Sequence, residues 1–267
     1  MSLKEVLCKL NLHDSIPKKL KHQSKKSIES QYKYWRHRIF YSIFIGYTLY
    51  YFTRKSATFA IPGIIEELGY SNADLGILST TLYVTYGISK LLSGIISDQA
   101  NPRYFMTIGL IITGLCNLCF GFCSSLFYMT LIWGINGIFQ GWGWHPCTKQ
   151  LTYWFKKSER GWWWSLQSTS HNVGGGLIPL LFAYVASFSS WRGGIIVAGA
   201  LAILVSLWLI ERLRGLPRSL GLPSIENSSR NESDIHDNEE DLKLEKIEHE
   251  KNNSKEILSE VLSKKNV

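Results

Sequence analysis

Residues 193–210 read GGIIVAGALAILVSLWLI and contain no charged side chain. Residues 104–123 read YFMTIGLIITGLCNLCFGFC and show the same property. A surface helix in a soluble protein carries charged side chains on its solvent-facing side. An uncharged apolar stretch of about 20 residues is instead typical of a transmembrane helix. The two stretches therefore predict an integral membrane protein and argue against a soluble globular enzyme.

The remaining apolar sequence predicts four further membrane spans. Because lipid offers no hydrogen-bond partners to the backbone, all six spans are expected to be helical, with Pro62 and Pro179 marking kinks or helix ends. We expect an all-α membrane protein with three parts: a basic tail (1–38), a six-helix transmembrane domain (39–211) and a polar, largely disordered tail (212–267). The predicted spans are 39–65, 75–97, 104–123, 126–147, 163–187 and 193–210.

The charge distribution predicts the orientation of these spans. The net charge is +8 and the mean hydropathy is −0.01, an average of apolar spans and charged ends. Segment 1–38 holds ten Lys and Arg residues and loop 148–162 holds four, whereas loop 66–74 holds none. Since cytoplasmic loops are enriched in Lys and Arg, both termini are predicted to lie in the cytoplasm, with the protein in the inner (plasma) membrane. We expect no nucleic-acid partner, because these cations are not interleaved on an amphipathic surface.

Cationic side chains inside the spans indicate an anionic ligand. Arg54, Lys55, Lys90 and His171 lie within apolar spans, where a cation costs about 2.5–3.5 kcal/mol to insert. The acidic residues between 39 and 211 lie at loops or span ends and cannot balance these cations. An anion bound in a wet cavity is the simplest compensation. For Lys55 and Lys90 snorkelling to the interface is the alternative, and for His171 a helix–helix hydrogen bond.

Helical spacing predicts which side chains accompany the cations. Tyr47, Tyr50, Tyr51 and Arg54 share one helix face, at offsets 0, 3, 4 and 7. The planar guanidinium of Arg54 suits a phosphate, because it can donate two hydrogen bonds at once. We expect no catalytic residue, cofactor or metal, and the spaced cysteines (Cys116, Cys119 and Cys123) are better explained as a small-residue helix face. The predicted substrate-binding residues are Arg54, Lys90, His171, Tyr51, Tyr86, Gln140 and Trp144.

Six short motifs resemble the organophosphate:phosphate antiporters of the major facilitator superfamily, over roughly residues 30–225. They are Tyr50–Lys55 (YYFTRK), Tyr86–Lys90 (YGISK), Ser97–Arg103 (SDQANPR), Phe139–Trp144 (FQGWGW), Glu159–Gly161 (ERG) and His171–Gly176 (HNVGGG). The details are closest to the hexose-phosphate branch, which includes transporters and a receptor-like sensor. This resemblance implies exchange of an organophosphate for inorganic phosphate, without covalent chemistry.

The resemblance also implies roles for individual residues. Arg54 becomes the phosphate-binding arginine of the first helix, and Lys90 and His171 belong to the cavity. Asp98 and Arg103 match a cytoplasmic loop that latches one conformation. The sequence departs from the family at Gln167-Ser168, where Trp-Asn is usual, and at His145, where the family has Pro, so the substrate's identity stays open.

Family members have twelve helices in two six-helix halves, and this chain resembles the amino-terminal half. We therefore expect a separate carboxy-terminal half or a second copy of the chain as partner. Two alternatives to a transporter half stay open at this point. One is an inactive remnant, because half a cavity leaves polar groups facing lipid. The other is a sensor that binds sugar phosphate without transporting it.

Overall fold

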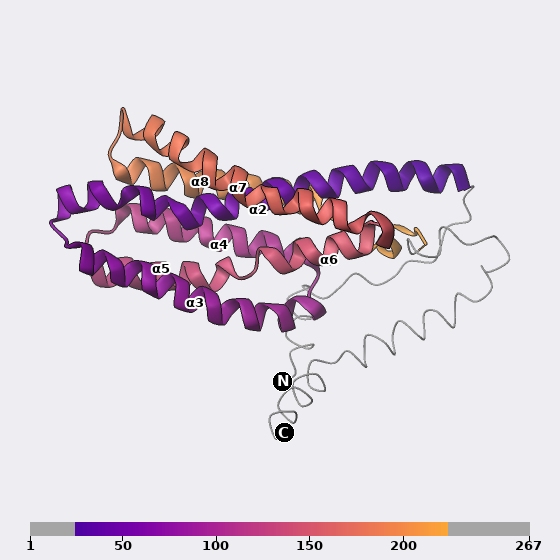
Figure 1. Cartoon of the computed structure of the whole chain (residues 1–267), viewed down its shortest axis with the longest axis horizontal. Coiled ribbons are helices and arrows are strands. Elements are labelled where there is room, and N and C mark those ends of the chain that lie inside the picture. The colour runs from indigo at the N-terminus through magenta and orange to yellow at the C-terminus, as the bar shows by residue number, and fades with distance from the viewer. Residues whose placement is uncertain (1–24, 224–267) are drawn as a thin grey trace, which may run out of the picture. The chain divides into compact units, whose positions relative to one another are not determined.

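The computed structural model describes residues 25–223, and within them the backbone forms seven α-helices and one short 3-10 helix (Figure 1). No strand occurs in this part of the chain, in agreement with the all-α fold predicted from the sequence. The elements are α2 (Lys25–Leu68), α3 (Asn72–Gln99), α4 (Pro102–Phe122), α5 (Leu126–Gln140), α6 (Trp144–Trp154), α7 (Lys157–Ala186), α8 (Trp191–Arg212) and η1 (Pro217–Leu220).

The helices differ from the predicted spans at three places, one of which is α7, which begins at Lys157, before the predicted start at 163. Helix α2 begins at Lys25, so the last part of the predicted basic tail is helical. The predicted span 126–147 is divided into α5 and α6 by a turn at residues 141–143. A larger residue at this turn would crowd Tyr50, because a Cβ atom at Gly143 would lie 3.0–3.2 Å from its ring, which would then have to shift by a few tenths of an ångström. By length and composition, two of the described helices, α4 and α8, qualify as membrane spans.

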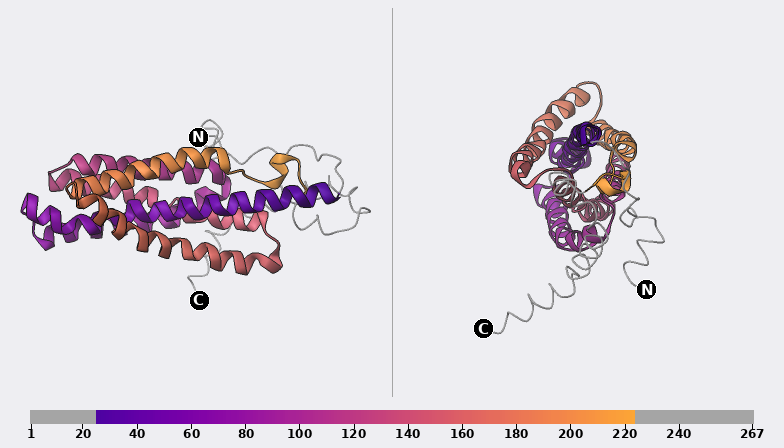
Figure 2. Two further views of the ribbon diagram at one scale, coloured as in Figure 1. Left: turned by 90° about the horizontal axis from the view of Figure 1, so that it is seen from above. Right: turned by 90° about the vertical axis from the view of Figure 1, so that its right-hand side faces the viewer.

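Close packing of α4 against α8 forms one side of the bundle, and α2 lies against both α8 and α7 (Figure 2). The contact between α4 and α8 depends on two glycines, because a Cβ atom on Gly199 would lie 2.6 Å from the carbonyl oxygen of Gly114. Such small residues are common where membrane helices approach closely. Helix α3 packs mainly against α5, beside the rest of the bundle. Side chains from α3 and α5 reach Arg54 on α2, although the backbones of these helices approach α2 at few points.

Basic side chains from neighbouring elements cap the carboxyl ends of three helices. Lys149 donates to α3, Arg160 to α6 and Arg38 to α8. The last carbonyls of a helix have no partner within it and carry a partial negative charge, so a cation there is stabilising. The acceptors are the carbonyl oxygens of Ser97, Asp98 and Ala100 for Lys149 (2.9–3.1 Å), Thr152 and Phe155 for Arg160 (3.0 and 3.3 Å), and Glu211 and Arg212 for Arg38 (3.1 and 3.4 Å).

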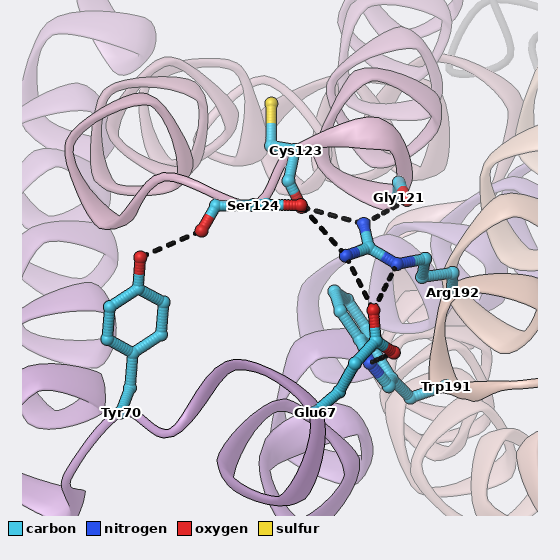
Figure 3. Close-up of polar contacts among 7 residues, drawn as sticks. All are labelled: Glu67, Tyr70, Gly121, Cys123, Ser124, Trp191 and Arg192. Carbon is cyan, nitrogen blue, oxygen red and sulfur yellow. Dashed lines mark hydrogen bonds and ion pairs between the residues drawn. The ribbon is translucent and has the colours of Figure 1, made fainter.

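A cluster around Arg192 joins the carboxyl ends of α2 and α4 to the start of α8 (Figure 3). Arg192, at the start of α8, donates from Nε and Nη2 to one carboxylate oxygen of Glu67, near the end of α2, at 3.1 and 2.9 Å. The indole of Trp191 donates to the other oxygen at 2.7 Å. Arg192 also caps α4, donating to the carbonyl oxygens of Gly121 (3.0 Å) and Cys123 (2.7 Å) and to the hydroxyl of Ser124 (3.0 Å). We call this set the Arg192 cluster.

Acid is expected to weaken the Arg192 cluster. Hydrogen bonds from Arg192, with a smaller contribution from Trp191, lower the pKa of Glu67 below its ordinary value. The stabilisation is therefore complete above the unfolded pKa of about 4.3 and is lost as the pH falls through the lower folded pKa. In a thermal-unfolding series from pH 7 to pH 3, followed by tryptophan fluorescence, the Tm of the Glu67→Gln variant should fall less steeply than that of the wild type.

The matched control for this series is Glu66→Gln, whose carboxylate is exposed and lies next to Glu67 in the chain. This variant should keep the wild-type dependence of Tm on pH. Equal slopes for Glu67→Gln and the wild type below pH 5 would show that the Glu67 carboxylate does not hold the cluster together.

Candidate functional site

Arg54 lies in the middle of α2 and is 7% exposed. Its Nε donates to the side-chain oxygen of Gln140 on α5 at 3.2 Å. The guanidinium carbon lies 4.7 Å from the ring centre of Tyr51 and 4.2 Å from that of Tyr86 on α3. Among residues 25–223 Nη2 is buried and has no hydrogen-bond partner, and no carboxylate pairs with the guanidinium. The cation is therefore held by two ring faces and one neutral amide, which leave Nη2 without a hydrogen-bond partner among the described residues.

Buried uncharged side chains continue inward from Gln140 and connect α2, α4 and α5. The amide nitrogen of Gln140 donates to the hydroxyl of Thr53 at 2.9 Å and to the side-chain oxygen of Asn136 at 3.1 Å. Asn136 and Asn117 both donate to the carbonyl oxygen of Thr53, at 3.1 and 2.9 Å. The hydroxyl of Ser56 donates to Asn117 at 2.5 Å. We call Thr53, Ser56, Asn117, Asn136 and Gln140 the Thr53 network; each is at most 1% exposed.

Sequence reasoning found Gln140 but missed the rest of the Thr53 network. A signal for Asn136 was present, because it lies four residues before Gln140 on the same helix face. Asn117 lies in an apolar span in which every neighbour suggested lipid or core. The central acceptor is a backbone carbonyl, which every residue has, so no sequence pattern could identify Thr53 as the meeting point.

The other predicted residues are connected to Arg54 through aromatic rings. The rings of Tyr51 and His171 lie 5.6 Å apart, which brings α7 next to α2. The ring centres of Tyr47 and Trp144 lie 5.1 Å apart, and Tyr47 also packs against Tyr51. His171 and Trp144 are half-buried.

Lys90 differs from these residues in being exposed. It lies one turn after Tyr86 on α3, and its ammonium nitrogen is 5.9 Å from the ring centre of Tyr86. The structure thus places Tyr51, Tyr86 and Gln140 directly around Arg54. It places His171 one ring away from the guanidinium, and Lys90 at the outer edge of Tyr86.

A pocket continues from Arg54 between α2 and α3. Its wall is apolar except for a few hydroxyl groups, and Arg54 is the cation among the lining side chains. The lining residues are Arg54, Ala57, Thr58, Ile61, Ile64, Leu75, Leu78, Ser79, Leu82, Tyr83 and Trp133.

The predicted latch residues form no ion pair with each other in the described part of the chain. The side chain of Asp98 is exposed, and its backbone carbonyl accepts a hydrogen bond from Lys149. The guanidinium of Arg103 lies over the ring of Tyr104 at 5.1 Å. The latch role of Asp98 and Arg103 stays a prediction.

Two sites at which the sequence departs from the resembling family make contacts between helices. Gln167 is fully buried, and its amide donates to the carbonyl oxygen of Ile43 on α2 at 3.3 Å. The ring nitrogen Nδ1 of His145 lies 3.1 Å from the hydroxyl of Ser93 on α3. Both side chains therefore join neighbouring helices, and neither contacts Arg54 through a described hydrogen bond.

Comparison with known families and proteins gives consistent results. Residues 43–260 match the family described as Major Facilitator Superfamily. The chain is 54% identical over 241 residues to the probable hexose phosphate transport protein of Chlamydia trachomatis serovar D, covering 89% of this chain and 53% of that protein. It is 49% identical over 201 residues to the membrane sensor protein UhpC of Escherichia coli K12 (75% and 46%). It is 39% identical over 204 residues to the glycerol-3-phosphate transporter of Bacillus subtilis 168 (74% and 46%).

The chain spans about half the length of the curated relatives it matches. Among solved structures, a bacterial homolog of the human lysosomal transporter Spinster, in an inward-facing and unoccupied conformation, superposes with a TM-score of 0.60. The match has 19% sequence identity and covers 69% of this chain and 44% of that chain. At this identity the likeness concerns the fold.

Replacing Asn117 by leucine should destabilise the bundle. The substitution keeps a similar volume but leaves the buried hydroxyl of Ser56 without its acceptor and removes one donor to Thr53. We expect a loss of about 1–3 kcal/mol in the free energy of unfolding, the typical effect of stranding a buried polar group. Thermal and denaturant unfolding in detergent measure it. Asn172→Leu, at an exposed position on α7, is the control and should change stability little; an equal loss in both variants would contradict a role of the Thr53 network.

Proposed function

This chain belongs to the Major Facilitator Superfamily, and we propose that it binds a sugar phosphate through Arg54 and exchanges it for inorganic phosphate across the membrane. It is an integral membrane protein of a transporter superfamily and not an enzyme. We propose that it acts as one half of an alternating-access transporter, together with a second six-helix half. That half comes from a separate chain or from a second copy of this one, since such halves are related by an axis along the membrane normal.

The observation that carries this proposal is the buried guanidinium of Arg54, which has no anionic partner among the described residues. A buried cation without a counter-charge costs several kcal/mol, and a ring face or an amide offsets only part of this cost. A phosphoryl group supplies the missing charge, and its oxygens match the spacing of the two Nη atoms. The relatives named for hexose phosphate and glycerol 3-phosphate support this class of ligand.

Neighbouring residues define what the site does with such a ligand. Tyr51 and Tyr86 hold the guanidinium between them. Lys90 and His171 lie farther out, where they can contact the outer phosphoryl oxygens, and Trp144 presents a ring to the sugar. Because inorganic phosphate and a phosphate ester share the same phosphoryl group, one cationic site can accept either ligand in turn.

We propose that the protein lies in the inner (plasma) membrane with both termini in the cytoplasm. Residues 39–211 form the transmembrane domain, and 1–38 and 212–267 its cytoplasmic ends. The positions of Arg38, Lys149 and Arg160 support this orientation, since each lies near the carboxyl end of a helix on the side where the loops are basic. The residues beyond 223 lie outside the described part of the chain.

Binding measurements on the Arg54 variants test the proposal. The 267-residue chain in lipid nanodiscs should bind both inorganic phosphate and glucose 6-phosphate in calorimetric titrations. Arg54→Ala should weaken both by about 100-fold or more, because it removes two charge-assisted hydrogen bonds. Arg54→Lys should weaken them by about 10-fold, because the charge remains but the fork is lost.

Lys55→Ala is the matched control, since Lys55 is the adjacent cation and makes no contact with Tyr51 or Tyr86 among the described cation–ring pairs. It should bind within about twofold of the wild type, whereas unchanged binding by Arg54→Ala would refute the anion site. Exchange of labelled phosphate in proteoliposomes, with and without a second half, then separates transport from binding alone. Binding in every preparation and exchange in none would identify a sensor, like the relative of that name.

A further inference from the structure

The side-chain oxygen and both N–H groups of Gln140 form hydrogen bonds with other residues of the protein. It is 1% exposed, its side-chain oxygen accepts from Nε of Arg54, and its amide nitrogen donates to Thr53 and to Asn136. A primary amide has two N–H groups, and both are used here. What remains is an oxygen lone pair, which cannot bind an oxyanion. These bonds favour an indirect role for Gln140 at the site, and the direct ligand contact that its sequence spacing predicts stays a prediction.

We propose that Gln140 and Thr53 are positioning residues that orient the guanidinium of Arg54 toward the anion. This inference rests on the proposed phosphate-binding function. A guanidinium has five N–H groups, of which one is on Nε and four are on the two Nη atoms. By accepting from Nε, Gln140 fixes one N–H of the guanidinium toward α5 and leaves the four N–H groups of the two Nη atoms for other partners. Nη2 is the buried atom that has no partner among residues 25–223.

The donors and acceptors of the Thr53 network can be assigned in one consistent way. The hydroxyl of Thr53 lies 3.1 Å from the carbonyl oxygen of Tyr50, to which it donates, so it accepts from Gln140. Asn136 donates to the carbonyl of Thr53, so its side-chain oxygen also faces Gln140. Both neighbours therefore accept from the amide nitrogen. A flipped Gln140 would place N–H groups against the N–H of Arg54, which excludes that orientation.

Asn117 makes the same arrangement rigid from α4. It donates to the carbonyl of Thr53 at 2.9 Å and to the carbonyl of Thr113 at 2.9 Å. The orientation of the Arg54 side chain is thus supported from α2, α4 and α5, through buried amides that bond to protein atoms. Pre-orientation of this kind raises affinity, because the ordering of the guanidinium is completed before the anion binds.

The decisive variant is Thr53→Val, which keeps the shape of the side chain but removes the acceptor for Gln140. In nanodiscs, with inorganic phosphate as the titrated probe, we expect its Kd to rise about 3- to 10-fold, the usual effect of one hydrogen bond. Thr53→Ser restores the hydroxyl and should bind within about twofold of the wild type. If Thr53→Val binds like the wild type, or if Thr53→Ser is equally impaired, the positioning role is wrong.

A double-mutant cycle separates positioning from a general loss of structure. In the Arg54→Lys background Thr53→Val should change the Kd less than twofold, because lysine has no planar fork to orient. An undiminished effect in that background would overturn the proposal. If Thr53→Val does not fold, Asn136→Ala takes its place in both backgrounds, with the same expected results.

A measurement without ligand distinguishes failure of this inference from failure of the proposed function. In nitrogen NMR spectra of the full chain, the Nε–H of Arg54 should exchange slowly with water in the wild type and in Thr53→Ser. It should exchange at least about 10-fold faster in Thr53→Val. Fast exchange in the wild type would refute the positioning by Gln140, whatever the phosphate titrations show. Slow exchange together with unaltered phosphate binding by Arg54→Ala would refute the function instead.

Discussion

The site in this bundle is built around one guanidinium, that of Arg54, which is buried without a carboxylate partner among the described residues. An ion pair would have satisfied Arg54, but it would also have cancelled the charge that an anion needs. Neutral groups hold the side chain instead: the rings of Tyr51 and Tyr86 and the amide of Gln140. These groups come from α2, α3 and α5, so the side chain of Arg54 connects three helices.

The other basic side chains near the helix ends are used differently. Arg38, Lys149, Arg160 and Arg192 donate to the last carbonyl oxygens of α8, α3, α6 and α4. Each of these cations meets a partial negative charge that belongs to the fold, and so it has less to offer a soluble anion. Arg54 lies in mid-helix, where the carbonyls are already bonded within the helix. The positive charge of Arg54 therefore has no negative partner among the described residues, whereas each cation at a helix end has one.

Sequence reasoning succeeded where chemistry depends on local composition or spacing. The uncharged runs predicted α4 and α8, and the offsets around Arg54 placed Tyr51 on its face. It failed where a residue's role depends on a distant neighbour. The turn between α5 and α6 places Gly143 against the ring of Tyr50, a contact between distant parts of the chain. In the sequence Lys149 indicates only the orientation of a loop, because its capping of α3 depends on how α6 packs, which no local pattern encodes.

The missing counter-charge at Arg54 also gives a reason to propose exchange of two anions and not one-way release. When a transporter reorients with an empty site, its buried cation has no counter-charge in states from which water is excluded. When phosphate is bound, the anion neutralises this cation. If that difference raises the barrier of the empty carrier by about 3 kcal/mol, empty reorientation is about 100-fold slower than loaded reorientation. Return of the site then requires a second anion. The neutral environment that Tyr51, Tyr86 and Gln140 provide is thus a physical basis for coupling one phosphate-bearing ligand to another.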